Sequence, residues 1–247
     1  MMENQILAIS DDGSIQYQQL TSKYLEGACE VTKKTVFTSG TMCRFLGVPE
    51  DEDALAELTR ISRTAAKDGV SVIAIDKTTD KVVAVAINKF LQKSQPFFEN
   101  FRKTFKNPKS LKIIDFITSS DDLCDLFEHC KVDCLMEILF LGTLPEYRKK
   151  GIAKKLCELS VDVAQKLYDG VNVKKCVDGK DLTLEPVPKV VYAIFVSFIS
   201  QRIGKELGFE IAAERSNRRL ELMGQVFENP NSETATTTIE YKMLGKN

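Results

Sequence analysis

Apolar residues recur at helical spacing in several stretches of the chain. This spacing predicts helices over residues 22–34, 50–69, 150–170 and 200–209. Acidic residues gather at the start of the second stretch, while Gly69 and Gly208 end the second and the fourth. Residues 35–49 show no clear period, and we expect an irregular segment there.

Short apolar runs rich in β-branched residues predict the strands. The runs 70–76 and 82–90 flank the polar segment KTTDK and predict a central antiparallel hairpin. Residues 134–144 and 187–196 predict two further buried strands. A short strand-like segment lies near residues 14–20, and the tail of the chain alternates into a last strand.

Residues 96–130 contain two further helical patterns, the second of which begins near Leu111. The first pattern carries an aromatic stripe: Phe97, Phe98, Phe101 and Phe105. Such a stripe is more often core than ligand pocket, although these rings could also line an amine site. The chain has no internal repeat and no low-complexity linker, so we expect one α+β domain over residues 1–247 with a mixed sheet.

The charge balance gives no general preference for polyanions. With 34 basic and 35 acidic side chains the net charge is -1, which favours neither nucleic acid nor a membrane surface as a partner. The longest apolar run, residues 190–196, is too short to span a bilayer, and the start lacks the apolar centre of a secretory signal. Seven cysteines without a C-x-x-C pair fit reduced thiols in a cytoplasmic protein without a metal.

The segment LPEYRKKGIAKKL, residues 144–156, concentrates positive charge at the predicted start of a helix. Cations there are unfavourable by about 0.3–1 kcal/mol each unless an anion binds opposite them. A glycine inside the first turns, here Gly151, costs about 1 kcal/mol relative to alanine and indicates that a ligand approaches the backbone closely. Strand, tight turn, basic cluster and helix start together predict a phosphate-binding site built from main-chain amides.

Two other interpretations of this basic segment stay open. It could be a solvated helix face or a nuclear-targeting patch, or it could bind nucleic acid directly. The buried strand before it and the near-neutral charge of the chain speak against both. Neither G-x-x-x-x-G-K-[ST] nor G-x-G-x-x-G occurs, so the predicted phosphate belongs to a ligand other than those these loops bind.

The sequence RKKGIA, residues 148–153, resembles the R/Q-x-x-G-x-G/A signature with which GNAT acetyltransferases bind the pyrophosphate of acetyl-CoA. Residues 137–156 and 197–209 are most similar to the insect arylalkylamine N-acetyltransferases, a branch that includes dopamine and agmatine acetyltransferases. The resemblance spans roughly residues 15–244, with its signature region at 135–209. It implies a mostly antiparallel sheet flanked by helices, with a helical insertion before the central strand.

The same resemblance implies a co-substrate and an activity. The backbone of Leu141, Gly142 and Thr143 would bind the pantetheine arm of acetyl-CoA. The turn and helix start would hold the diphosphate through Arg148, Lys149, Lys150, Gly151, Ile152, Ala153 and Lys154. The acetyl group would pass to the primary amine of a small arylalkylamine or polyamine-like substrate, by direct attack in a ternary complex.

Two residues are candidates for the catalytic chemistry. An alkylammonium with a pKa of about 10.4 must lose a proton before it attacks, and Glu137 on the core strand could accept that proton. Glu137 could equally face solvent or pair with a lysine. Ser200 matches a serine that the insect enzymes use near the acyl group. His129, the one histidine, lies at a predicted helix end, where a surface or capping role is more common.

The sequence departs from the family pattern at two positions. The insect enzymes carry an acid in a D-E-P-L type segment, but the corresponding residues 36–42 read VFTSGTM, with Gly40 near the place of the acid. Many relatives carry a tyrosine acid in the helix before G-F, where this chain has Gly204. An alternative is therefore a protein that binds acyl-CoA but has lost turnover and has a regulatory or binding role.

Overall fold

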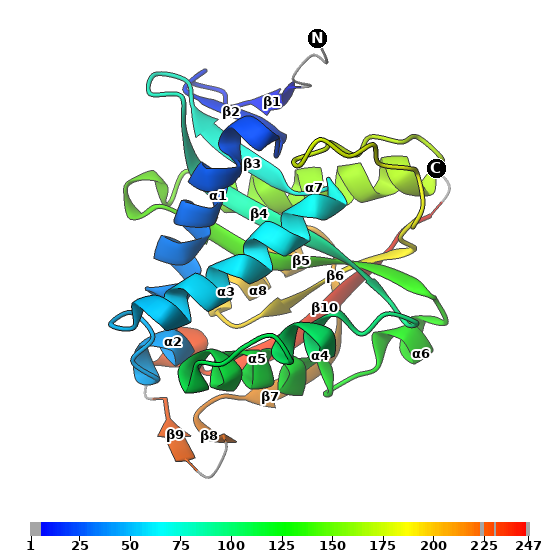
Figure 1. The fold of residues 1–247 in the computed structure, drawn as a ribbon. Coiled ribbons are helices and arrows are strands. Elements are labelled where there is room, and N and C mark those ends of the chain that lie inside the picture. The colour runs from blue at the N-terminus through cyan, green and yellow to red at the C-terminus, as the bar shows by residue number, and fades with distance from the viewer. Residues whose placement is uncertain (1–5, 223–224, 230, 246–247) are drawn as a thin grey trace.

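An eight-stranded sheet forms the centre of the computed structural model, which describes residues 6–222, 225–229 and 231–245 (Figure 1). The strand order is β1-β2-β3-β4-β5-β6-β10-β7. The strands are β1 (Ile6–Ile9), β2 (Ile15–Gln19), β3 (Val72–Asp76), β4 (Lys81–Gln92), β5 (Cys134–Thr143), β6 (Val190–Phe195), β7 (Glu210–Ser216) and β10 (Thr236–Met243). Only β5 and β6 run parallel, so the expected mixed and mostly antiparallel sheet is confirmed.

Helices cover both faces of this sheet. One face carries α1 (Leu25–Thr32), α3 (Glu52–Ala65) and α5 (Pro108–Asp121). The other face carries α7 (Ile152–Tyr168) and α8 (Phe198–Glu206). Fully buried apolar side chains such as Ile61 of α3 and Leu156 of α7 point into the two layers. Figure 1 shows α1 and α3 crossing the front of the sheet.

Local sequence signals explain where the long helices begin and end. The Asp51 carboxylate accepts the Ala54 N–H at 3.0 Å and caps the start of α3. The Asn107 side chain caps α5, and Pro108 follows at the first helical position, where proline is favoured. A short 3-10 turn extends α3 to Gly69, whose left-handed φ of 73° ends the helix as predicted.

Residues 35–49 are largely helical, so the expectation of an irregular segment there is wrong. The helix α1 continues as a π-helix over Lys33–Phe37, and α2 follows at Thr41–Phe45. Phe37 and Met42 are buried in the core between α1 and the sheet, and this packing holds the segment in place. Tertiary contacts therefore override a weak local period.

The insertion between β4 and β5 holds three helices where the sequence predicts two. They are α4 (Phe97–Arg102), α5 and α6 (Leu126–Cys130). Phe105, the last ring of the predicted aromatic stripe, lies in the turn after α4. The helical insertion before the central strand is nevertheless present.

Two parts of the sheet structure have no counterpart among the predicted elements. Residues 210–228 form β7 and a separate two-stranded sheet of β8 (Arg219–Leu222) and β9 (Gln225–Glu228), and β1 precedes the predicted first strand. Strand β7 lies at the edge of the sheet, and its residues are exposed or only partly buried. Such an edge strand lacks the apolar alternation on which strand prediction depends.

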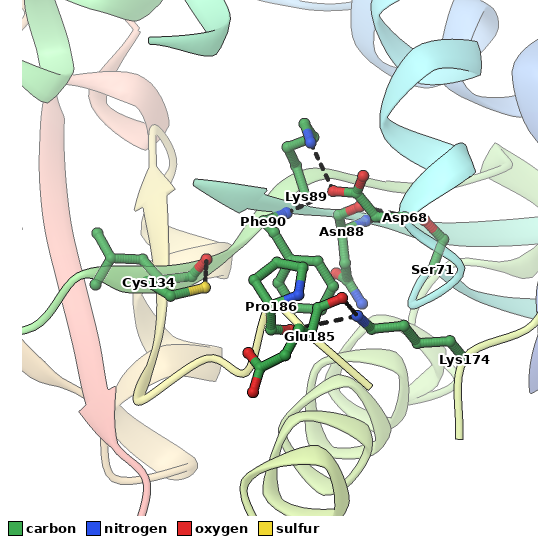
Figure 2. Close-up of polar contacts among 10 residues, drawn as sticks. Asp68, Ser71, Asn88, Lys89, Phe90, Cys134, Lys174, Glu185 and Pro186 are labelled. Atoms are coloured by element: carbon green, nitrogen blue, oxygen red, sulfur yellow. Dashed lines mark hydrogen bonds and ion pairs between the residues drawn. The ribbon is translucent and has the colours of Figure 1, made fainter. Parts of the chain in front are cut away.

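A polar cluster fastens the loop between α7 and β6 to the sheet (Figure 2). The Lys174 amine donates to the carbonyl oxygens of Glu185 at 2.9 Å and Pro186 at 3.3 Å. The amine also lies 4.7 Å from the centroid of the Phe90 ring. The backbone N–H of Phe90 in turn donates to the Asp68 carboxylate at 2.7 Å. Burial lowers the pKa of Lys174. The amine replaces its lost hydration with carbonyl oxygens and an aromatic face.

We expect Lys174→Met to lower the free energy of unfolding by about 1–3 kcal/mol, because two charge-assisted hydrogen bonds and a cation–π contact are lost. Urea unfolding measures the change. Lys175→Met is the matched control, since Lys175 is the next residue but is not part of this cluster. Equal losses in the two variants would show that the cluster contributes nothing specific.

No helix among the described residues is both long and apolar enough to cross a membrane. Residues 1–5 lie outside the described residues. They belong to the N-terminal segment in which the sequence shows no apolar centre of a secretory signal. The seven cysteines carry free thiols.

Candidate active site

The two parallel strands at the centre of the sheet pair over only part of their length. β5 and β6 share a register from Leu135 opposite Val190 to Glu137 opposite Tyr192. Beyond this point β5 continues along β4 to Thr143, while β6 continues along β10. In the strand pairing of the described residues, the edge of β5 that faces β6 is therefore open from residue 138 onward.

A cavity of about 370 Å³ lies where these two strands separate. Residues 137–141 of β5 and 194–196 at the end of β6 line it, together with side chains of α5 and of residues 36–43. Most of these side chains are apolar or aromatic. A mostly apolar hollow of this size with a few polar groups is typical of small-ligand sites.

Glu137 brings a carboxyl group into this cavity. Its side chain lines the cavity, yet the residue is only 1% exposed, so the alternative that Glu137 faces bulk solvent is wrong. Lys89 lies opposite Glu137 on the neighbouring strand β4, and its amine forms an ion pair with the Asp68 carboxylate at 2.6 Å. Among the described residues, Glu137 is the one acidic residue that lines the cavity.

Ser197 and Ser200 at the start of α8 also line the cavity. They form a capping box in which the Ser200 N–H donates to the Ser197 hydroxyl at 3.2 Å, and their two hydroxyl oxygens lie 2.8 Å apart. The Ser200 hydroxyl also donates to the Ser197 carbonyl at 2.9 Å. Ser200 therefore has a structural role in starting α8 and at the same time presents its hydroxyl to the site.

Cys43 is the thiol that lines the cavity. Burial raises the pKa of this thiol to about 12. Because the thiolate is the nucleophilic form, Cys43 is unsuited to carry an acyl group at neutral pH.

Gly40, which the sequence resemblance places near the position of the acid of the insect enzymes, lies in the cavity wall. A Cβ atom at this position would come within 2.4 Å of the Val36 carbonyl oxygen. The π-helix that ends at Phe37 brings this carbonyl close, and the Gly40 N–H donates to it at 2.9 Å. The backbone therefore leaves no room for an acid, or for any side chain, at residue 40.

We expect Gly40→Ala to lower the free energy of unfolding by about 1–3 kcal/mol, the usual cost of forcing an atom into filled space. Gly245→Ala is the control, because nothing lies within 4 Å of a Cβ atom at residue 245. Denaturant unfolding of both variants measures the difference. A Gly40→Ala protein as stable as the control would show that the backbone at residue 40 can yield.

Gly204, at the place of the tyrosine acid of other relatives, is also a packing requirement. A Cβ atom there would lie 2.0 Å from the Glu240 Oε2 atom and 2.6 Å from the Phe195 ring. Glu240 is buried beneath α8, where burial raises the pKa of its carboxyl group and Thr238 donates to it at 2.7 Å. A tyrosine at residue 204 would collide with this carboxyl group.

The segment that follows β5 leads to an exposed helix start. A short 3-10 turn over Pro145–Tyr147 comes first, and α7 begins after Gly151. Gly151 precedes the helix with a left-handed φ of 75°, so the expectation that it lies inside the first turn is wrong. Glycine is favoured there because the backbone requires a positive φ. The space around residue 151 is open, since a Cβ atom would meet nothing within 4 Å.

The start of α7 is a suitable place for an anion. Gly151 offers no side-chain cap, and the first turn contains no acidic residue, so backbone N–H groups and the positive end of the helix dipole face outward. Arg148, Lys149 and Lys150 come before the helix and not within it, and Lys149 itself has a positive φ of 63°. Among the described groups, the buried Thr143 hydroxyl oxygen nearby has no hydrogen-bond partner.

Several contacts orient the basic side chains around this helix start. Arg148 donates to the Thr143 carbonyl at 3.1 Å, and the Lys154 amine pairs with Glu206 of α8 at 2.8 Å. The Lys150 amine lies 5.3 Å from the centroid of the Tyr147 ring, and the Tyr147 hydroxyl donates to Asp76 at 2.6 Å. These contacts join the turn to the sheet and to α8.

Other sequence candidates lie away from the cavity. The His129 ring meets the Tyr241 hydroxyl at 3.4 Å in an exposed contact. The aromatic stripe does not line the cavity either, because Phe98 and Phe105 are buried in the core while Phe97 and Phe101 line a different hollow. The aromatic stripe therefore contributes no residue to the lining of this cavity.

Other aromatic and polar residues line the cavity, and sequence reasoning missed them. The aromatic ones are Phe37, Phe116, Phe140 and Phe195, and the polar ones include Ser120, Asn217, Asn229 and Thr234. They belong to separate elements whose local periods say nothing about a shared cavity. Only the order of strands in the sheet brings them together.

The sheet order, the open edge of β5 and the helix start after it agree with the GNAT-like α+β fold that the sequence resemblance implies. Among solved structures, the chain is similar to arylalkylamine N-acetyltransferase 2 from Aedes aegypti, at 22% identity and a TM-score of 0.72 over 94% of this chain and 99% of that one. It is similar to the Drosophila melanogaster polyamine N-acetyltransferase, described as forming N-acetylagmatine, at 16% identity and a TM-score of 0.70 over 93% and 100%.

A third similar structure is the C-terminal condensation domain of Ebony in complex with β-alanyl-dopamine, at 10% identity and a TM-score of 0.62 over 93% of this chain and 99% of that one. No family model matches the chain, and no curated protein matches it significantly. At these identities the likeness establishes the fold, and the chemistry must be argued from the residues of this chain.

Proposed function

We propose that this protein is an acetyl-CoA-dependent N-acetyltransferase that acetylates the primary amine of a small substrate by direct attack in a ternary complex. The observation that carries the proposal is the continuity of β5. Its open edge leads from the cavity that contains Glu137 to the uncapped start of α7. One stretch of chain can thus bind a coenzyme and present it to a carboxyl group. We place this activity in a single domain over residues 1–247.

The residues present fit the coenzyme. Backbone groups of Leu141, Gly142 and Thr143 lie on the open edge of β5, where an extended pantetheine arm could pair as an added strand does. The diphosphate would bind the amides and basic side chains of the helix start, namely Arg148, Lys149, Lys150, Gly151, Ile152, Ala153 and Lys154. The open space at Gly151 supports this placement, because nothing there blocks a ligand from the backbone.

We assign Glu137 as the general base that accepts the proton of the amine. Acetyl-CoA supplies the activated acetyl group, and the amine must be neutral to attack it. Glu137 can hold the incoming ammonium as an ion pair and then accept its proton, directly or through a water molecule.

The departing thiol needs little help. A thiol pKa of about 8.5 lets the thiolate leave near neutral pH without the tyrosine acid that Gly204 replaces. The Ser200 hydroxyl can form a hydrogen bond with the sulfur or with the amine, because Ser200 lines the cavity. The capping box with Ser197 holds it in this position. The protonated state of Cys43 supports direct attack over an acyl-enzyme route.

The alternative is an acyl-CoA-binding protein without turnover. The packing at Gly40 and Gly204 favours it, because neither position can carry the acid of its relatives. The two functions share the coenzyme site and differ in whether Glu137 alone suffices as a base.

A thiol-release assay with acetyl-CoA over dopamine, serotonin, tyramine, agmatine and spermidine tests the proposal, together with calorimetric titration of CoA. Binding of CoA with amine-dependent thiol release supports the transferase. Binding of CoA without release from any amine supports the alternative, and absence of CoA binding overturns both.

A further inference from the structure

A cationic side chain that has no acidic partner among the described side chains lies directly behind the wall of the cavity. The Arg215 guanidinium of β7 lies 5.4 Å from the centroid of the Phe116 ring and donates to the Ser120 hydroxyl at 2.9 Å. Phe116 and Ser120 both line the cavity. Arg215 is thus separated from the ligand space by one side chain.

Within the described residues, the groups that bind this guanidinium are all neutral. It donates to the Ser119 carbonyl at 3.2 Å and the Ser119 hydroxyl at 3.4 Å, and its buried Nε atom has no hydrogen-bond partner within the described part of the chain. No carboxylate of the described side chains pairs with it, and Asp115 on the same helix, α5, binds Arg102 instead. An arginine keeps its charge in proteins, and Arg215 is partly buried behind the cavity wall, so solvent screens its positive potential only in part.

The cavity itself can neutralise one positive charge. Glu137 is its one acidic lining residue among those described, and the other polar lining groups are hydroxyls and amides, including Asn217, Asn229 and Thr234. An ammonium at Glu137 would therefore be compensated. A second ammonium or a guanidinium farther along the ligand would have no acidic partner and would be repelled by Arg215.

We propose that Arg215 is a specificity-determining residue, and that the acceptor is a monoamine with an uncharged, largely apolar body, not a diamine or a guanidine-bearing amine. This inference rests on the proposed function, because it assumes that the cavity holds the amine. It selects between the two kinds of acceptor, arylalkylamine-like and polyamine-like.

The sharpest test compares n-pentylamine with 1,5-diaminopentane, which share a carbon chain and differ by a second ammonium at neutral pH. The ratio of their dissociation constants and, where turnover occurs, of kcat/KM is measured for the wild-type protein. We expect the monoamine to be preferred by about a hundredfold or more, as charge repulsion in a low-dielectric site predicts. Equal use of the two amines, or a preference for the diamine, would overturn the inference.

Variants then test the part of Arg215. Arg215→Gln should reduce the preference by about tenfold or more, because it removes the charge, whereas Arg215→Lys should retain it. A second pair leaves Arg215 in place: Ser120→Asp should reduce the preference by pairing with the guanidinium, and Ser120→Asn, of similar size, should not. If neither Arg215→Gln nor Ser120→Asp changes the ratio, Arg215 does not set specificity.

Binding ratios do not depend on turnover, so the two proposals fail separately. Amine binding with the expected ratio but no thiol release would refute the transferase and leave the specificity inference standing. Thiol release with both amines at similar efficiency would do the reverse.

Discussion

Gly151→Glu should weaken the binding of CoA by about a hundredfold or more while leaving the fold intact. The new carboxylate would stand at the helix start where the diphosphate is proposed to bind, where it would repel the diphosphate and compete with it for the backbone amides and basic side chains. The fold should survive, because a Cβ atom at residue 151 meets nothing within 4 Å and an acid at a helix start is favourable. Titration calorimetry measures the affinity, and thermal unfolding checks the fold.

Two controls separate charge from backbone strain. Gly151→Asn introduces a side chain that tolerates a positive φ without adding charge, so it should bind CoA much more tightly than Gly151→Glu does. Gly170→Glu places the same side chain at the other end of α7, where the glycine has a φ of 87° and open space around it. Unchanged affinity in Gly151→Glu would refute the placement of the coenzyme at this helix start.

Glu137→Gln should lower kcat by about a hundred- to ten-thousand-fold, the range that a positioned general base contributes. Glutamine keeps the shape of the side chain but cannot accept the proton of the ammonium. Affinity for CoA should stay close to that of the wild type, since the proposed diphosphate site lies beyond the other end of β5.

The matched control is Glu240→Gln, because Glu240 is a second buried carboxyl group on the same sheet but is not among the residues that line the cavity. Stopped assays with acetyl-CoA and a responsive amine compare the two variants with the wild type. Full turnover in Glu137→Gln would show that the proton leaves by another route. A loss of the same size in Glu240→Gln would point to damage to the sheet and α8 in place of base chemistry.

The two glycines that replace family acids show how structure changes the meaning of a sequence difference. In the sequence, Gly40 and Gly204 simply read as absent catalytic groups. In the fold, the space that a side chain would need is already occupied at both positions. The Val36 carbonyl oxygen occupies it at Gly40, and the Glu240 carboxyl group occupies it at Gly204. Restoring the acids by substitution is therefore expected to damage the packing and not to recover a base.

The amino-acid sequence is enough to predict the α+β class, the core strands β3, β4, β5 and β6, and the helix α7. Each depends on local signals: apolar runs that must be buried, caps and glycine stops. The basic turn before α7 was visible for the same reason, because charge next to a helix start is a property of neighbouring residues. Glu137 was visible as an acid in an apolar strand.

The surroundings of these groups follow from the packing of the whole fold. The separation of β5 and β6, the burial of Glu137, and the meeting of Ser120, Asn217 and Ser200 around one cavity depend on strand order. The edge strand β7 and the helical segment near Gly40 lack local patterns strong enough to predict. Contacts between residues distant in sequence are set by the packing of whole elements, which no local period encodes.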